Sequence, residues 1–247
     1  MATQGCDKIV SRNLIKDGNA LYRAGNYALA LEKFEQAAKL EPDFPILQLH
    51  LGYSAMALAS SHQDQVCAQK ATAAFVQYMR LRPKDERGPK YYLQILLDSG
   101  HYNEARQFLE QRYRARPNDL KNIIALGMVN SRAGDFEQAL KWYAKGADLQ
   151  PKEPQPQYVI GTLCWKQLYK NSTIHDATRI KIADQGISAL EKALKLQPDY
   201  VEALTYANLL YRERAKGQTD PIAKKKDLRK AELYYKRALE LMKKNSV

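Results

Sequence analysis

Apolar residues recur at helical spacing along most of the chain, in stretches that are separated by prolines. Proline disrupts a helix interior because it lacks a backbone N–H and clashes with the preceding turn. Five prolines each end one periodic stretch and precede the next: Pro42, Pro83, Pro117, Pro151 and Pro198. Their spacings are 41, 34, 34 and 47 residues. The pattern predicts an all-helical chain built from a repeat of 34 residues, some units being longer.

Small residues recur at fixed positions when each unit is numbered so that its final proline is position 32. Position 8 is glycine in four units: Gly18, Gly52, Gly127 and Gly161. Position 15 is glycine in three units: Gly25, Gly100 and Gly134. Position 20 is alanine in five units: Ala30, Ala71, Ala105, Ala139 and Ala231. Small residues at positions 8 and 20 allow two antiparallel helices to approach closely, and glycine at position 15 is typical of a helix end.

Large residues recur at two other positions. Position 17 holds Tyr27, Tyr102 and Phe136. Position 24 holds Phe34, Phe75, Leu109, Tyr143, Leu190 and Tyr235. We expect these side chains, including Tyr235, to pack between helices and neighbouring units, so that the high tyrosine content needs no ligand to explain it.

This pattern resembles the tetratricopeptide repeat family, and the clearest unit runs from Gly18 through Tyr27 and Phe34 to Pro42. Individual units depart from it, with Leu93 and Asn208 at position 8 and Tyr78 at position 27. The resemblance implies an all-α, right-handed superhelical solenoid in which residues 11–247 form one domain after an N-terminal segment, 1–10. The expected repeats are 11–44, 45–85, 86–119, 120–153, 154–200 and 201–242.

Repeats two, five and six carry extra residues between positions 15 and 20, which predicts longer helix pairs there. Each insertion offers an acidic residue before renewed helical periodicity: Asp64, Asp176 and Asp220. Aspartate is a favoured N-cap, so we expect each to begin a second helix. The insertions are either neutral loop variation or an edge surface for a partner.

Catalytic and metal-binding motifs are absent from the sequence. The four histidines are scattered, and no HExxH, Walker, GxGxxG or GxSxG motif occurs. Three widely spaced cysteines predict neither a disulfide framework nor a cysteine-based zinc site. Cys164 falls at a buried repeat position and is expected to be a core thiol, whereas the burial of Cys67 is left open. We therefore expect a non-enzymatic protein without cofactor or metal.

In the tetratricopeptide repeat family, the first helix of each pair lines a concave groove. The positions expected to face this groove combine aromatic and methionine side chains with cations and amides. The candidate partner-binding residues are Asn19, Arg23, Tyr53, Met56, Arg87, Tyr91, Gln94, Met128, Arg132, Tyr158, Trp165 and Tyr206. Amides can bond a peptide backbone, cations attract carboxylates and rings supply rigid apolar contact. The sequence predicts an interaction scaffold or adaptor that binds an extended peptide or a partner helix.

The net charge of the 247 residues is +12, and more than half of it lies near the C-terminus. Residues 212–247 hold twelve cations and five acids, a net charge of +7. A basic patch stands out within them: Lys224, Lys225, Lys226, Arg229 and Lys230. The patch is either a solvated cap of the solenoid or a site for an acidic protein, lipid headgroups or RNA. Nucleic acid is the weakest of these because no recognised binding motif occurs.

The N-terminal residues Gly5 and Cys6, directly before the first repeat, resemble the end of a bacterial lipobox. Cys6 is thus a possible lipidation site, and the alternative function is an envelope lipoprotein that assists the assembly of an envelope complex. However, no charged segment or apolar segment precedes Cys6, as a signal peptide requires. The chain as written is expected in the cytoplasm, and as a membrane-anchored periplasmic lipoprotein if a signal peptide has been removed from a longer precursor. No apolar run is long enough to span a membrane.

Overall fold

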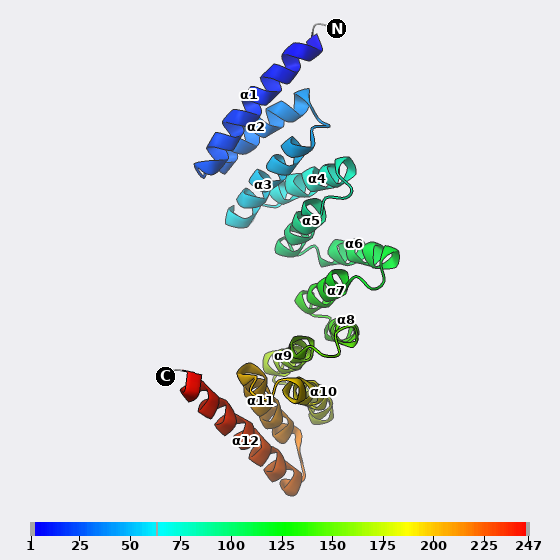
Figure 1. Ribbon diagram of the computed structural model, residues 1–247, viewed down its shortest axis with the longest axis vertical. Helices are drawn as coiled ribbons and strands as arrows, with labels where there is room; N and C mark the ends of the chain where they lie inside the picture. Colours follow the sequence, from blue (N-terminus) through cyan, green and yellow to red (C-terminus); the bar gives the residue numbers. More distant parts are fainter. Residues whose placement is uncertain (1–2, 63, 246–247) are drawn as a thin grey trace. The chain divides into compact units, whose positions relative to one another are not determined.

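A computed structural model describes residues 3–62 and 64–245 (Figure 1). These residues form twelve α-helices and contain no strand. The helices are α1 (Thr3–Arg23), α2 (Tyr27–Leu40), α3 (Pro45–His62), α4 (Gln65–Leu81), α5 (Arg87–Asp98), α6 (Tyr102–Ala115), α7 (Leu120–Arg132), α8 (Phe136–Asp148), α9 (Pro154–Lys170), α10 (Asp176–Leu196), α11 (Val201–Gly217) and α12 (Pro221–Asn245). The first helix therefore begins at Thr3 and includes most of the segment that precedes the first expected repeat.

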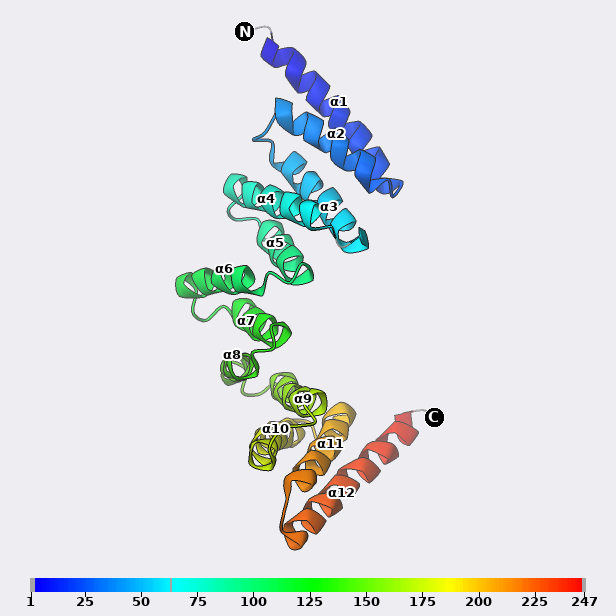
Figure 2. The same cartoon turned by 180° about the vertical axis from the view of Figure 1, so that it is seen from behind.

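The chain divides into two compact units, 1–107 and 108–247, with the boundary inside α6. In the first unit α1 packs against α2 and α3 against α4, while α2 and α4 each contact the next helix. In the second unit the pairs are α7 with α8, α9 with α10 and α11 with α12, and α8 and α10 contact the helix that follows. Figure 2 shows the same succession of neighbours from behind. The alternation of first and second helices agrees with a tetratricopeptide repeat solenoid.

Four helix pairs share a close contact between position 8 and position 24. A Cβ atom added to Gly18 would lie 2.7 Å from Phe34 Cε1, and one added to Gly52 would lie 2.5 Å from Phe75 Cε1. The second unit repeats this contact between Gly127 and Tyr143 and between Gly161 and Leu190. Phe34 and Phe75 are fully buried. Because glycine has no side chain, it leaves room for the large side chain of the paired helix.

Three first helices end in a glycine with a left-handed backbone, as the repeat pattern predicts. Gly25, Gly100 and Gly134 have φ angles of 79°, 75° and 82°. After α1, the N–H of Asn26 donates to Leu21 O at 2.9 Å and the N–H of Gly25 donates to Tyr22 O at 3.0 Å. These two bonds form a Schellman motif, which satisfies carbonyl groups that the helix end leaves free. A side chain at position 15 would be strained in this conformation.

The longer helix pairs that the insertions predict are present, and two of the three expected N-caps are confirmed. The Asp64 carboxylate accepts from the N–H of Val66 at 2.8 Å, and that of Asp220 accepts from the N–H of Ile222 at 3.0 Å. The expected cap Asp176 is wrong, because it is the first residue of α10. The cap is His175, whose Nδ1 accepts from the N–H of Ala177 at 3.3 Å. Gln63, inside the insertion of repeat two, lies outside the described residues.

The expectation that Tyr235 packs between helices is also wrong, since 44% of this residue is exposed. No described helix covers the face of α12 that carries position 24. Its neighbour Tyr234 is the ring that packs, stacking on Tyr211 with centroids 5.6 Å apart. Burial of position 24 therefore depends on the first helix of the next repeat, which packs over it.

Ion pairs join the last three helices of the second unit. The Arg179 guanidinium on α10 donates to Glu213 on α11 at 2.5 Å, and both side chains are nearly buried. Arg214 on α11 donates to Asp227 on α12 at 2.5 Å and to Asp184 on α10 at 2.6 Å. These charged groups compensate one another, so burial does not leave them unpaired. Four charged residues of the C-terminal segment 212–247 thereby take part in ion pairs: Glu213, Arg214, Lys216 and Asp227.

Two cysteines lie in the hydrophobic core, one in each unit. Cys164 is fully buried, as its repeat position predicts, and Cys67 is 9% exposed. Burial raises the pKa of the Cys67 thiol to about 11 and that of Cys164 to about 12. The thiolate is the reactive form of cysteine, and burial disfavours it at both positions.

Replacing Gly52 by leucine should lower the free energy of unfolding by about 2 kcal/mol or more, because the new side chain collides with the ring of Phe75. Urea denaturation followed by circular dichroism measures this loss. Ala28→Leu, at an exposed helical position, is the matched control and should change stability by about 0.5 kcal/mol at most.

Adding Phe75→Leu to Gly52→Leu should recover part of the lost stability. The third repeat already carries leucine at both of these positions, Leu93 and Leu109. A Gly52→Leu variant as stable as the parent would show that the contact between positions 8 and 24 does not constrain the pair.

Cys67 and Cys164 should resist a thiol reagent such as DTNB at pH 8 in the folded protein and react fully in urea. At that pH a thiol with the pKa of Cys67 is thiolate in about one molecule per thousand. Peptide mapping by mass spectrometry identifies the labelled residues, and Cys67→Ala and Cys164→Ala variants check the assignment. Rapid labelling of either residue in the folded protein would contradict its burial.

Candidate functional site

The described residues contain no group of three or more histidine, cysteine, aspartate or glutamate side chains that could hold a metal ion. Nor does any helix within the described ranges have the length and apolar character needed to cross a membrane. The candidate sites are therefore the surfaces that the helix pairs present.

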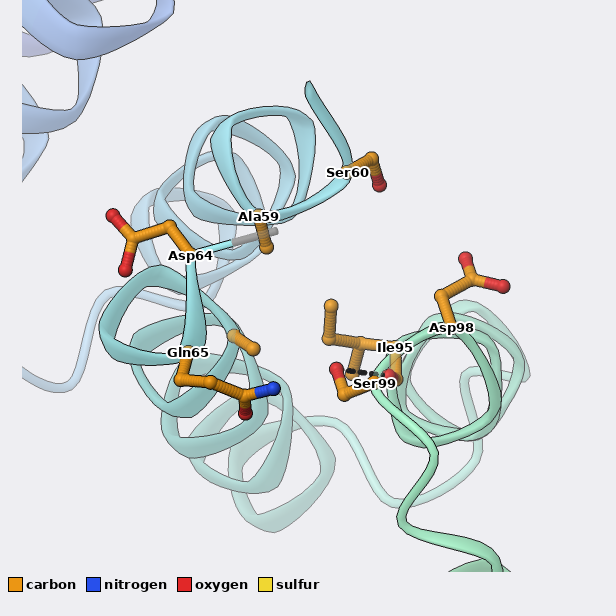
Figure 3. A pocket seen from close by; sticks show the side chains of 8 residues that line it. Ala59, Ser60, Asp64, Gln65, Ile95, Asp98 and Ser99 are labelled. Atoms are coloured by element: carbon orange, nitrogen blue, oxygen red, sulfur yellow. Dashed lines mark hydrogen bonds between the residues drawn. The ribbon is translucent and has the colours of Figure 1, made fainter. Parts of the chain in front are cut away.

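A recess of about 480 Å³ lies at the insertion of repeat two, between the ends of α3, α4 and α5 (Figure 3). Ser60, Asp64 and Gln65 line it on one side and Asp98 and Ser99 on the other, and the Asp64 carboxylate points away from α5. The recess forms because α3 and α4, with 18 and 17 residues, are longer than α5, with 12. Asp64 caps α4, and Ser99 Oγ donates to Ile95 O at 2.7 Å. Two of its polar side chains thus serve the ends of helices.

The first unit brings together three of the predicted groove residues. Tyr53 on α3 and Tyr91 on α5 form an edge-to-face pair with ring centroids 4.7 Å apart. Both rings rest on Phe75, at 6.0 and 5.8 Å. Met56 is partly buried and packs against the same core cluster. Burial raises the pKa of Tyr53, and a hydrogen bond to Tyr91 adds to the shift. Tyr53 and Tyr91 are thus fixed in orientation and only partly covered.

A recess of about 380 Å³ adjoins this pair between α1 and α3. It is lined by the predicted residues Asn19, Arg23 and Tyr53, together with Tyr22 and His50. The His50 ring lies between Phe34 and Tyr53, at centroid distances of 5.6 and 6.4 Å. Burial and the charge of Arg87 lower the pKa of His50, which keeps the imidazole neutral at pH 7. The exposed cation Arg23 thus lies beside the uncharged rings of Tyr22 and Tyr53 in this recess.

Arg87, a second predicted cation of this groove, is already engaged. Its Nη2 donates to Asp85 Oδ2 at 2.7 Å and its Nε to Oδ1 at 3.1 Å. The Tyr78 hydroxyl donates to the same carboxylate at 2.6 Å. These donors hold the pKa of Asp85 well below its usual range. The sequence predicted that Arg87 attracts a carboxylate of a ligand, but Asp85 of the same chain provides that carboxylate. The predicted residue Gln94 on α5 is exposed.

The second unit joins three predicted residues into a continuous row of rings on α9 and α11. The predicted members are Tyr158, Trp165 and Tyr206, and the row also includes Tyr200 and Tyr169. Successive centroid distances are 5.1 Å from Tyr200 to Tyr158, 5.7 Å from Tyr158 to Tyr206, 5.3 Å from Tyr206 to Trp165 and 4.9 Å from Trp165 to Tyr169. We refer to these five residues as the α9–α11 aromatic row. Met128 and Arg132 lie on α7 and belong to no ring contact of this row.

Sequence reasoning missed the two ends of the aromatic row. Tyr169 lies beyond the groove positions, in the extended part of α9, and Tyr200 is the N-cap of α11. Tyr169 stacks on Trp165 at an interplanar angle of 20° and is 71% exposed. Its spacing of four residues from Trp165 was the available signal, because residues i and i+4 share a helix face.

The basic patch lies on the first turns of α12. Lys224, Lys225, Lys226, Arg229 and Lys230 are all exposed. No ion pair involves them among the residues the structure describes. Arg214 and Lys216 nearby do have acidic partners. Among the described residues, the patch thus belongs to the part of the basic C-terminal segment that forms no ion pair.

The possible lipidation site, Cys6, lies within α1. Its side chain is outside what the structure describes, so lipidation stays a prediction.

Comparisons with known proteins agree with the helical repeat. Residues 18–58 match a model described as "TPR repeat", and residues 121–153 match one described as "Tetratricopeptide repeat". No curated protein sequence matches the chain.

Solved structures with this arrangement of helices include the C-terminal part of a TPR repeat-containing protein from Cytophaga hutchinsonii. It has a TM-score of 0.60 and 18% identity, and the match covers 94% of this chain and 80% of that one. MamA from Desulfovibrio magneticus RS-1 matches with a TM-score of 0.49 and 20% identity, over 77% of this chain and 96% of its own. YrrB, described as a TPR protein with an unusual peptide-binding site, has a TM-score of 0.47 and 18% identity, over 77% and 88% of the two chains.

The repeat register, the helix pairs and the matched repeat models agree with one another. The chain is a tetratricopeptide repeat protein with an all-α solenoid fold.

Proposed function

We propose that this protein is a non-enzymatic scaffold or adaptor that binds an extended peptide or a helix of a partner protein in the concave groove that its first helices line. The observation that carries the proposal is the α9–α11 aromatic row. Its five rings are in unbroken contact, and Tyr169 at one end is 71% exposed.

Rings in this arrangement favour recognition of a polypeptide. Tyrosine and tryptophan supply large contact areas while losing little conformational freedom, because each side chain has two rotatable bonds. Here the rings also fix one another, so the surface is ordered before a partner arrives, which reduces the entropic cost of binding. Tyrosine and tryptophan are also the residues most enriched at binding hot spots.

The first unit supports the same function with a smaller surface. Tyr53 and Tyr91 present partly covered rings, and the adjoining recess adds an amide, Asn19, and an exposed cation, Arg23. In the second unit Lys166 is exposed on α9, one residue after Trp165. Cations beside apolar rings favour a partner that combines acidic and hydrophobic side chains.

The two tryptophans of the chain provide a matched test. Trp165 belongs to the aromatic row, while Trp142 on α8 forms an edge-to-face contact with Tyr113 at 4.9 Å. Both are partly buried. A peptide selected from a displayed library of random 12-residue peptides should lose about tenfold or more in affinity with Trp165→Leu, because a hot-spot ring is removed. Trp142→Leu should leave the affinity unchanged. Fluorescence polarisation of the labelled peptide measures both.

A second readout reports on the site directly. In Trp142→Phe the remaining tryptophan is Trp165, so peptide binding should change its emission. Thermal midpoints of the two leucine variants control for a general loss of stability. If Trp165→Leu binds the selected peptide as tightly as the parent does, the aromatic row is not the binding surface.

A further inference from the structure

The first three turns of α12 combine a dense positive charge with two highly exposed aliphatic side chains. Ile222 is 80% exposed and Leu233 is 60% exposed. They lie on the same line of the helix as Lys226 and Arg229, because the spacings 222, 226, 229 and 233 follow the helical repeat. Together with Lys225 and Lys230 they form one exposed surface along α12. We call these six residues the α12 basic ridge.

The cations of the ridge lie close together on the second and third turns of α12, beyond the N-cap Asp220. Lys225 with Arg229, and Lys226 with Lys230, are pairs of like charge four residues apart, which destabilise a helix. Asp227, the nearest acid, is buried and bonded to Arg214. Packing within the chain does not account for these cations, and a bound anionic surface relieves their repulsion.

The shape of the ridge suits a deformable surface, into which side chains can insert, better than it suits a bound polypeptide. Its apolar side chains stand at the two ends, about 16 Å apart along the helix axis, with the cations between them. They project into solvent, whereas a peptide-binding surface offers its apolar groups as pockets. The six residues include no asparagine, glutamine, serine or threonine that could bond a peptide backbone.

Two other occupants fit less well. None of the six residues is aromatic, so the ridge has no ring on which a nucleic-acid base could stack. A second copy of the chain would bring one basic ridge against another and add to the repulsion.

We propose that the α12 basic ridge binds the surface of a bilayer that contains anionic lipids. Ile222 and Leu233 enter the boundary between headgroups and acyl chains, as the apolar face of an interfacial helix does. The lysine and arginine side chains between them lie at the level of the lipid phosphates. The interaction is peripheral and reversible, and it leaves the aromatic surfaces of the first helices for a protein partner.

Sedimentation of the full chain with vesicles tests this inference. The protein should bind vesicles of 70% phosphatidylcholine and 30% phosphatidylserine at 0.1 M NaCl and bind pure phosphatidylcholine vesicles far less. Binding should weaken at 0.5 M NaCl, since salt screens the headgroup charge. Each lysine or arginine near such a surface contributes about a fivefold change in partitioning. The triple variant Lys226→Gln, Arg229→Gln, Lys230→Gln should therefore lose about a hundredfold.

A triple variant of equal net charge is the control. Lys181→Gln, Lys192→Gln, Lys195→Gln changes three exposed lysines of α10 in the same unit and should bind nearly as well as the parent. If both triple variants lose binding equally, the effect belongs to net charge and not to the ridge, which overturns the proposal.

The aliphatic residues distinguish a bilayer from a free anion. Ile222→Ser with Leu233→Ser should weaken vesicle binding at least tenfold and leave binding of inositol hexakisphosphate unchanged. Ile9→Ser with Val66→Ser, at aliphatic positions that are 65% and 61% exposed, is the matched control. Equal binding to both kinds of vesicle, no binding to either, or tighter binding to polyglutamate or oligouridylate than to the anionic vesicles would each overturn the proposal.

Discussion

The close contact between a glycine on four of the first helices and a bulky side chain on the paired second helix is the interaction on which the other features depend. It recurs between Gly18 and Phe34, between Gly52 and Phe75 and again in the second unit. Because the ring or leucine fills the space of a missing side chain, the contact fixes how each first helix is rotated about its axis. The rotation in turn decides which residues of that helix remain outward. The partly covered rings of Tyr53 on α3 and of Tyr158 and Trp165 on α9 are thus a consequence of core packing.

Features that repeat along the chain could be predicted from the sequence, whereas features that depend on a neighbouring element could not. The left-handed glycines follow from position 15 alone, since that turn is local. The exposure of Tyr235 does not follow from position 24, because burial there requires a following helix. The capping of α10 by His175 depended on a choice between adjacent residues, and both can accept a backbone hydrogen bond. Tyr169 and Tyr200 lie outside the groove positions and join the aromatic row only through contacts in space.

The charged residues show the same difference, because the sequence gives their number and only the structure gives their partners. The sequence establishes a net charge of +7 over residues 212–247, but not which of those charges are already neutralised. Within the described part of the chain, Arg214 and Lys216 have acidic neighbours, whereas the cations of the α12 basic ridge form no ion pair. Arg87 illustrates the converse, because its bidentate pairing with Asp85 removes a cation that the sequence offered to a ligand. Ion pairs form only in the folded chain, and they distinguish cations that stabilise the fold from cations that can contact a ligand.

The two surfaces of the second unit differ in chemistry in a way that suits two kinds of partner. The α9–α11 aromatic row offers rigid rings, which give directional contact to a polypeptide. The α12 basic ridge offers protruding aliphatic groups and cations without ion pairs among the described residues. Such groups require a negatively charged surface but no particular shape of the partner. Both surfaces depend on α11, which contributes Tyr206 to the row and holds α12 through Arg214 and Asp227. Since one helix supports both, a partner bound on the row as proposed would be held at a fixed distance from a surface bound by the ridge, as an adaptor requires.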